Sequence, residues 1–283
     1  MKNKSYLEGS IPLIQSSLAE DIKTGDITTD ALIPEDENCT AQLISKEAGV
    51  IAGLEIFKMV FNLINKNASA IEFNIEKNDS EKVSKGDLIA TIKGSYKTIL
   101  TGERTALNFL QRMSGIATKT NKFVEAIKGT KAQLLDTRKT VPGFRALDKY
   151  SVLAGGGKNH RFGLYDMVMI KENHIRVIGS ITEAIKLVRD KYKDKYQIEI
   201  ETTNMEEVKE ALVLQPDIIM LDNMSLKQMR EAVDFIDGNV KTEASGNINL
   251  NSIRAVAETG VDFISVGSLT HSVKALDISL LII

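Results

Sequence analysis

Cationic side chains are concentrated between residues 136 and 174, in a chain whose formal net charge is only -2. Several of them end an apolar run or lie beside turn-forming residues, where an α/β protein presents side chains to a ligand. The cationic residues are Arg138, Lys139, Arg145, Lys149, Lys158, His160, Arg161, Lys171 and His174. This pattern predicts a binding site for a small anion rather than a solvated face.

The predicted strands that surround this segment end on residues that could do chemistry. In chain order, these strand ends carry Arg138 and Lys139, then Lys171, then Glu201, then Asp222, then Ser245 and Gly246, then Gly267 and Ser268. The carboxyl ends of parallel barrel strands share one mouth. The series therefore predicts a cavity with a basic wall, an acidic wall and a cradle of small residues.

The small residues at the last two strand ends suit a phosphate group. Backbone N–H groups can approach a phosphate where no bulky side chain intervenes. Each of the turns Ser245-Gly246-Asn247 and Gly267-Ser268 could by itself be an ordinary turn. Because they follow adjacent strands in the order that barrel enzymes use, phosphate binding is the favoured interpretation.

The remaining candidates allow two interpretations each. Glu201 and Asp222 could position Mg²⁺ or a ribose hydroxyl, since Mg²⁺ takes one or two carboxylates together with waters. They could equally form salt bridges to Lys139 or Lys171. His160 adjoins Arg161 and could contact the ligand, but a single histidine can also be a structural hydrogen-bonding residue.

The elements that must position these residues alternate as in parallel βαβ units from residue 133 onward. The predicted strands are Gln133–Arg138, Met167–Lys171, Gln197–Thr202, Ile218–Asn223, Lys241–Gly246 and Phe263–Ser268. Apolar residues between them recur at helical spacing: Ile181, Ile185, Val188 and Tyr192; Leu226, Met229, Val233 and Ile236; Leu250, Ile253 and Val256. The short repeat between the last strands favours a TIM-like barrel. Six evident strands against eight in a complete barrel indicate either an open barrel or strands that the pattern does not reveal.

The first part of the chain has a different pattern. Residues 49–53, 71–75 and 82–94 alternate as short antiparallel strands joined by glycine turns, which predicts a smaller α+β domain. A helix over residues 103–117 carries one apolar stripe. We expect an N-terminal domain at residues 1–104, a catalytic barrel at 105–270 and a tail at 271–283 that docks on the N-terminal domain.

Composition excludes several classes of protein. With 43% hydrophobic and 26% charged residues, the chain is expected to be globular, and its near-balanced charge gives no general field for nucleic acid. The one cysteine, Cys39, cannot form an intrachain disulfide, and no thiol–imidazole cluster suggests zinc. The chain lacks an apolar signal core at its start and a run long enough to cross a bilayer, so we expect a cytoplasmic protein.

A binding module of the biotinyl or lipoyl type is one alternative to an enzyme, because residues 86–94 look like a strand of such a domain. No hairpin with a Met-Lys-Met or Asp-Lys-Ala sequence is present to carry the modified lysine. A shared sandwich fold would explain the similarity.

The motifs together resemble the quinolinate phosphoribosyltransferase family, and the resemblance extends over nearly the whole chain. The segments that carry it are residues 103–111, 136–143, 155–161, 170–174, 199–201, 221–224, 243–248 and 265–272. A nearer alternative is a relative with the same fold that acts on another nucleobase acid. Lys171 and the complete set of arginines argue against that alternative.

The resemblance implies an N-terminal α/β sandwich, an open seven-stranded barrel and a homodimer in which Arg104 reaches the neighbouring subunit's site. It implies an Mg²⁺-dependent reaction of quinolinate with phosphoribosyl pyrophosphate that gives nicotinate mononucleotide, CO₂ and pyrophosphate. Residues implied to bind quinolinate are Arg138, His160, Arg161 and Lys171, and residues implied at the ribose and Mg-diphosphate are Lys139, Glu201 and Asp222. Those implied at the 5′-phosphate are the turns that contain Ser245, Gly246, Asn247, Gly267 and Ser268. Thr137 and Leu269 are also expected to bind substrate. Among all of these residues, Lys139, Lys171, Glu201 and Asp222 are the expected catalytic residues, and Glu201 and Asp222 are expected to contact the metal through water or diphosphate.

Overall fold

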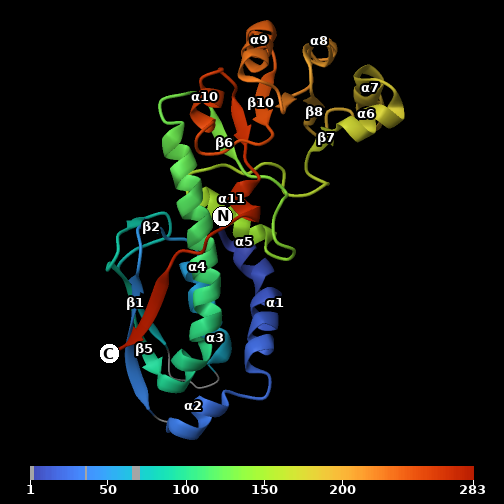
Figure 1. The fold of residues 1–283 in the computed structure, drawn as a ribbon. Helices are drawn as coiled ribbons and strands as arrows, with labels where there is room; N and C mark the ends of the chain where they lie inside the picture. The colour runs from blue at the N-terminus through green and yellow to red at the C-terminus, as the bar shows by residue number, and fades with distance from the viewer. Residues whose placement is uncertain (1–2, 36, 66–70) are drawn as a thin grey trace. The chain divides into compact units, whose positions relative to one another are not determined.

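The computed structural model describes residues 3–35, 37–65 and 71–283 (Figure 1). The chain divides into two compact units. Unit 1 comprises residues 1–121, 140–156 and 272–283, and unit 2 comprises residues 122–139 and 157–271. The boundary predicted at residue 104 stays a prediction; helix α4 (Tyr96–Ala126) is continuous through that position.

Unit 1 contains an antiparallel sheet in the order β12-β1-β5-β3. Its strands are β1 (Asn38–Ser45), β3 (Glu72–Ile75), β5 (Leu88–Ser95) and β12 (Ile278–Ile282). A second pair consists of β2 (Gly49–Val50) and β4 (Lys82–Val83). The C-terminal strand β12 pairs along β1, so residues from the two ends of the chain form one sheet.

Apolar side chains from helices and sheet build the core of unit 1. The helices are α1 (Asn3–Ile22), α2 (Ile27–Leu32), α3 (Leu54–Ile64), α4 and α5 (Arg145–Ala154). The stripe predicted on residues 103–117 is buried, with Ala106, Leu110, Met113 and Ala117 fully inaccessible. Because this stripe packs against apolar residues of α3 and β1 in the same cluster, the helix forms through tertiary burial as well as local propensity.

Unit 2 is built on a parallel sheet in the order β6-β11-β10-β9-β8-β7. The strands are β6 (Gln133–Leu135), β7 (Val168–Ile170), β8 (Ile198–Thr202), β9 (Ile218–Asp222), β10 (Lys241–Ser245) and β11 (Phe263–Ser265). All five strand pairings are parallel. The six predicted strands are confirmed, although the structure ends β6 and β11 three residues earlier than the sequence pattern did.

A short seventh segment lies at the free edge of β6. Lys158 forms an isolated parallel bridge with Leu135, and its backbone N–H donates to the carbonyl of Leu134 (2.8 Å). In the described residues no ladder closes the sheet between β6 and β7. The predicted fold class, an open TIM-like barrel with a smaller N-terminal α+β domain, is therefore confirmed, and a single bridge was too short for the pattern to detect.

Helices connect the strands of unit 2, as Figure 1 shows for α6 to α10. They are α6 (Glu172–Ile178), α7 (Ile181–Tyr192), α8 (Met205–Val213), α9 (Leu226–Ile236), α10 (Ile253–Ala257) and α11 (Ser268–His271). The side chains of Ser180, Asn204 and Ser225 cap α7, α8 and α9 by accepting backbone N–H bonds. The predicted apolar stripes bury Ile185, Met229 and Ile253, whereas three further members are exposed: Tyr192, Leu226 and Leu250, the last of which lies before α10.

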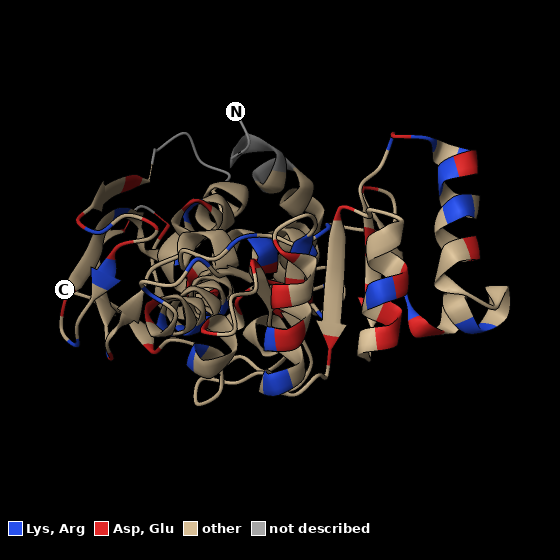
Figure 2. Cartoon of the chain, turned by 90° about the horizontal axis from the view of Figure 1, so that it is seen from above, with Lys and Arg blue, Asp and Glu red and all other residues tan. Residues whose placement is uncertain are grey.

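Figure 2 shows lysine and arginine interspersed with aspartate and glutamate along the helices and loops. The mixture agrees with a net charge of -2 and with the prediction that any electropositive site is local. None of the helices in the described part of the chain has the length and apolar composition needed to cross a membrane.

Candidate active site

A cavity of about 810 Å³ opens at the carboxyl ends of the parallel strands of unit 2. The sequence predicted that these ends would converge, and they do. The candidates that line the cavity are Thr137, Arg138, Lys139, His160, Arg161, Lys171, Glu201, Asp222, Ser245, Gly246, Asn247, Gly267 and Ser268. A volume of this size suits a ligand larger than a single pyridine ring, since small-molecule sites range from about 300 to 1,000 Å³.

Two guanidinium groups dominate the basic wall. Arg161 donates to the carbonyl of Met167 (3.2 Å) and approaches the sulfur of Met169 (3.5 Å). Burial lowers the pKa of Arg161, and repulsion from Arg138 lowers it further, while Glu199 partly offsets both effects. Two arginines that repel each other at a cavity wall are stabilised by an anion between them, so this wall is suited to a carboxylate.

Lys139 is fixed at its backbone while its side chain remains exposed. Its N–H donates to Thr137 Oγ1 (3.1 Å), and its carbonyl accepts from Thr270 Oγ1 (2.8 Å). A Cβ on Gly267 would lie 2.9 Å from Lys139 Cδ. The lysine side chain therefore passes close to Gly267 and leads the ammonium group toward the cavity.

The acidic wall is partly paired with the basic wall. Lys171 Nζ lies 2.9 Å from Glu201 Oε2, so the salt bridge that the sequence allowed for Glu201 is formed. Asp222 accepts a hydrogen bond from the side-chain amide of Asn223 (2.7 Å). Both carboxylates line the cavity. They supply the oxygen donors that Mg²⁺ prefers, with room for metal-bound waters, and therefore fit a magnesium site.

The turns after β9 and β10 are locked together. Asn223 donates its backbone N–H to the carbonyl of Ser245 (2.9 Å), and Asn247 donates a side-chain N–H to Asn223 Oδ1 (3.1 Å). Gly246 has a φ of +98°, and a Cβ there would collide with the carboxamide of Asn223. This turn therefore has a sequence requirement that an ordinary surface turn lacks.

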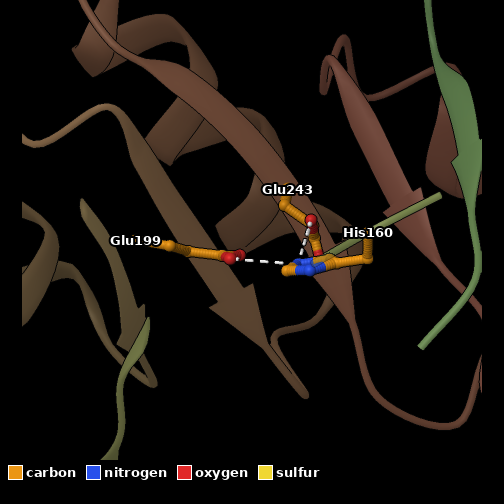
Figure 3. Close-up of side chains that lie close together, drawn as sticks. All are labelled: His160, Glu199 and Glu243. Carbon is orange, nitrogen blue, oxygen red and sulfur yellow. Dashed lines mark ion pairs between the residues drawn. The ribbon is translucent and has the colours of Figure 1, made fainter. Parts of the chain in front are cut away.

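His160 lies deeper, between two carboxylates (Figure 3). Its Nε2 is 3.0 Å from Glu199 Oε2 and 3.4 Å from Glu243 Oε2, and both glutamate side chains are fully buried. The three side chains place ligand atoms within 4.8 Å of one another, which is close enough to surround a metal ion. A protonated imidazole ring can itself supply the positive charge between the two acids.

The two ring nitrogens of His160 meet opposite demands. Burial lowers the pKa of this histidine, but Glu199 and Glu243 outweigh burial and raise the pKa to about 10. The N–H of Arg161 points at Nδ1 (2.7 Å), which favours a neutral ring. Nε2 therefore carries a proton toward the two carboxylates, while Nδ1 accepts from the Arg161 N–H until the ring gains a second proton. Burial in turn raises the pKa of Glu199, with His160 opposing the shift.

Two candidates lie elsewhere. Leu269 is fully buried and does not line the cavity. Arg104 is an exposed residue of α4 in unit 1. The cavity also contains residues that were not among the candidates, namely Met169, Met220, Asn223, Glu243, Ile248, Asn249, Ser265 and His271. The two-residue alternation along β10 and β11 was a usable signal for Glu243 and Ser265, because inward-facing residues recur at that spacing.

Two family models match successive parts of the chain. The N-terminal domain of quinolinate phosphoribosyl transferase matches residues 26–114, and the C-terminal domain of the same family matches residues 116–281. The chain belongs to the quinolinate phosphoribosyltransferase family. Among its relatives, the probable nicotinate-nucleotide pyrophosphorylase (carboxylating) of Bacillus subtilis is 44% identical over 95% of this chain and 91% of its own length.

Solved structures of this family have the same fold. The nicotinate-nucleotide pyrophosphorylase of Francisella tularensis is 46% identical, with a TM-score of 0.93 over 98% of this chain and 96% of that one. The corresponding protein of Ehrlichia chaffeensis is 40% identical, with a TM-score of 0.90 over 96% of this chain and 98% of that one. The match extends over both units.

Proposed function

We propose that this protein transfers the phosphoribosyl group of phosphoribosyl pyrophosphate to quinolinate, forming nicotinate mononucleotide, CO₂ and pyrophosphate for NAD biosynthesis. The observation that carries the proposal is the single cavity in which cations, carboxylates and small-residue turns from separate strand ends converge. That arrangement accommodates a flat dianionic acid beside a phosphorylated sugar. The family membership of the chain supports the same assignment.

Quinolinate would bind at the basic wall. Arg138 and Arg161 present guanidinium groups, which pair with carboxylates in two parallel hydrogen bonds. Each such charge-assisted bond contributes about 1.5–3 kcal/mol. Lys171 and His160 also line the cavity and would complete the set of residues around the diacid. Holding both carboxylates would orient the pyridine nitrogen toward the ribose carbon that it attacks.

Phosphoribosyl pyrophosphate would bind along the rest of the cavity. Ser245, Gly246 and Asn247 together with Gly267 and Ser268 would hold the 5′-phosphate through N–H groups. Thr137, Lys139, Glu201 and Asp222 would surround the ribose and the diphosphate. Bound there by Glu201 and Asp222, directly or through water, Mg²⁺ would neutralise charge on the departing diphosphate.

In this reaction the protein orients the substrates and stabilises charge, and it forms no covalent bond with them. The ring nitrogen bonds to C1 of the ribose as the C1–O bond to pyrophosphate breaks. The nitrogen then carries a positive charge, which stabilises the carbanion left at C2 when the adjacent carboxylate leaves as CO₂. A proton then replaces CO₂ at C2. Cations that line the cavity would stabilise the leaving diphosphate and keep the diacid in place.

Arg104 enters the proposal through the subunit arrangement. It is exposed on α4 and belongs to unit 1 rather than to the unit that contains the cavity. We propose that the protein is a homodimer in which Arg104 contributes to the neighbouring subunit's cavity. In that cavity, Arg104 would add a hydrogen-bond donor for the substrate carboxylates beyond those that the subunit's own chain supplies.

The deciding experiment is a turnover assay with the purified protein, phosphoribosyl pyrophosphate and Mg²⁺. Quinolinate should be consumed with stoichiometric release of CO₂ and pyrophosphate. Nicotinate is the control, because it lacks the carboxylate that leaves. Turnover of nicotinate in preference to quinolinate would redirect the assignment to a relative that acts on another nucleobase acid.

A further inference from the structure

Three fully buried carboxylates surround one short segment of the cavity, residues 159–161. They belong to Asp136, Glu199 and Glu243, each with no exposed surface. Buried negative charge next to a site for a dianion weakens binding of the dianion, so these three carboxylates are expected to have another role. The contacts of these three side chains indicate what that is.

Glu199 and Glu243 clamp the imidazole of His160 from two strands. Glu199 precedes Glu201 by two positions on β8, and Glu243 precedes Ser245 by two positions on β10. Side chains two apart on a strand share a face, so Glu199 and Glu243 point to the same side of the sheet as Glu201 and Ser245, and Glu243 also lines the cavity. Figure 3 shows the ring between the two carboxylates. The Nε2 distances, 3.0 and 3.4 Å, make both of them ion-pair partners of His160.

Asp136 holds the backbone of the same segment. Its carboxylate accepts from the His160 N–H (2.9 Å) and from the Asn159 side-chain amide (2.6 Å). Leu135, which precedes Asp136, forms a parallel bridge with Lys158, which precedes Asn159. The segment is therefore fixed at its backbone by β6 and at its ring by β8 and β10, which leaves it little freedom to reorient.

We propose that Glu199 and Glu243 are positioning residues that act through His160 to hold Arg161 in the orientation that binds the substrate diacid, with Asp136 fixing the backbone between them. The inference rests on the proposed function. Arg161 follows His160 directly, and its N–H lies 2.7 Å from His160 Nδ1, so rotation of the ring disturbs the arginine backbone. The two glutamates therefore act on the basic wall, and not on Lys139 or Asp222 in the part of the cavity proposed for phosphoribosyl pyrophosphate.

The direction in which quinolinate affinity changes in a variant distinguishes a positioning role from a purely electrostatic one. Glu243→Gln removes a negative charge next to a dianion site and keeps the side-chain shape. If the glutamates contributed only field, quinolinate would bind more tightly to the variant. If they position His160 and Arg161, quinolinate binds more weakly, by about tenfold or more, as loss of a supporting contact does at other sites.

The experiment measures KM for quinolinate and for phosphoribosyl pyrophosphate in Glu243→Gln, Glu199→Gln and Asp136→Asn. KM for quinolinate should rise about tenfold while KM for phosphoribosyl pyrophosphate changes by less than about twofold. Asp262→Asn is the matched control. Asp262 also accepts a backbone N–H, from Thr242 (3.0 Å), but it lies at the amino end of β11, away from the cavity. This control should leave both KM values unchanged.

A double-mutant cycle tests whether the glutamates act through the histidine. In a His160→Gln background, Glu243→Gln should change KM for quinolinate by less than about twofold, because the group that it positions is already gone. Additive effects, equal rises in both KM values, or tighter quinolinate binding would each overturn the inference. Should Glu199→Gln fail to fold, the Glu243→Gln cycle decides the question. If the wild-type protein did not turn over quinolinate, the proposed function itself would be refuted.

Discussion

Gly246→Ala tests how closely the turn after β10 is constrained. The wild-type residue has a φ of +98°, and an added Cβ meets the side chain of Asn223. A left-handed conformation costs a non-glycine residue about 1–2 kcal/mol. Displacing the Asn223 carboxamide, which donates to Asp222 and accepts from Asn247, adds about 1–3 kcal/mol. We therefore expect the variant to lose about 2–5 kcal/mol of unfolding free energy, or to shift the turn and relieve the clash.

A shift of the turn would appear in function. If one backbone N–H no longer reaches the 5′-phosphate, the loss of about 1.5 kcal/mol corresponds to an increase of about tenfold in KM for phosphoribosyl pyrophosphate. KM for quinolinate should change less, because the basic wall is built by other strands. The assays are urea unfolding followed by circular dichroism and steady-state kinetics with each substrate varied in turn.

Gly238→Ala is the matched control in the same unit. Gly238 also has a positive φ, +74°, but nothing lies within 4 Å of an added Cβ. Its alanine variant should show only the conformational cost, about 1–2 kcal/mol, with normal kinetics. If Gly246→Ala matched Gly238→Ala in both stability and KM, the close approach of Asn223 would impose no constraint, and the argument for a built phosphate cradle would be refuted.

Four further predictions concern the same site. Arg138→Ala should lower kcat/KM for quinolinate by about 10² or more, since it removes a donor from the basic wall, and near-normal turnover would reject that role. Mixing inactive Arg104→Ala with inactive Arg138→Ala subunits should restore activity through one intact composite site; mixed dimers without activity would show that Arg104 does not act in trans. Removing Mg²⁺ with a chelator should abolish turnover, and added Mg²⁺ should restore it; full activity in the chelator would exclude the metal. Because the pKa of His160 is raised to about 10 from 6.5, its protonation stabilises the fold fully below about pH 6.5, and this contribution disappears as pH rises through 10. The urea midpoint should fall more steeply over that window in the wild type than in His160→Gln, and parallel profiles would count against a charged ring.

The strand ends of unit 2 were predictable because two periodicities alternate there. Aliphatic runs of strand length and apolar stripes at helical spacing identified all six ladder strands, and the rule that parallel strand ends share one edge placed Lys171, Glu201 and Asp222 at one cavity. The signal was weaker in unit 1. Strand β1 was missed, and its pairing with β12, far along the chain, depends on contacts that no local pattern encodes.

The site was less predictable where burial changes the role of a residue. Glu199 belongs to a motif that the sequence analysis quoted, but its sequence neighbours do not indicate that it lies buried against His160. The close approach of Gly246 to Asn223 likewise joins two turns from different strands. Neither distance can be inferred from spacing along the chain, because both depend on how strands pack around the barrel.

By itself, the sequence determined the alternating α/β architecture, the family and the set of residues available for binding an anion. These follow from local periodicity and from side-chain chemistry, which each segment carries with it. Only the tertiary structure decided which charges neutralise one another: Glu201 pairs with Lys171, while Glu199 and Glu243 enclose His160. The energy of an ion pair falls as the distance between the charges grows. Which charges pair is therefore set by packing across the barrel and not by order along the chain.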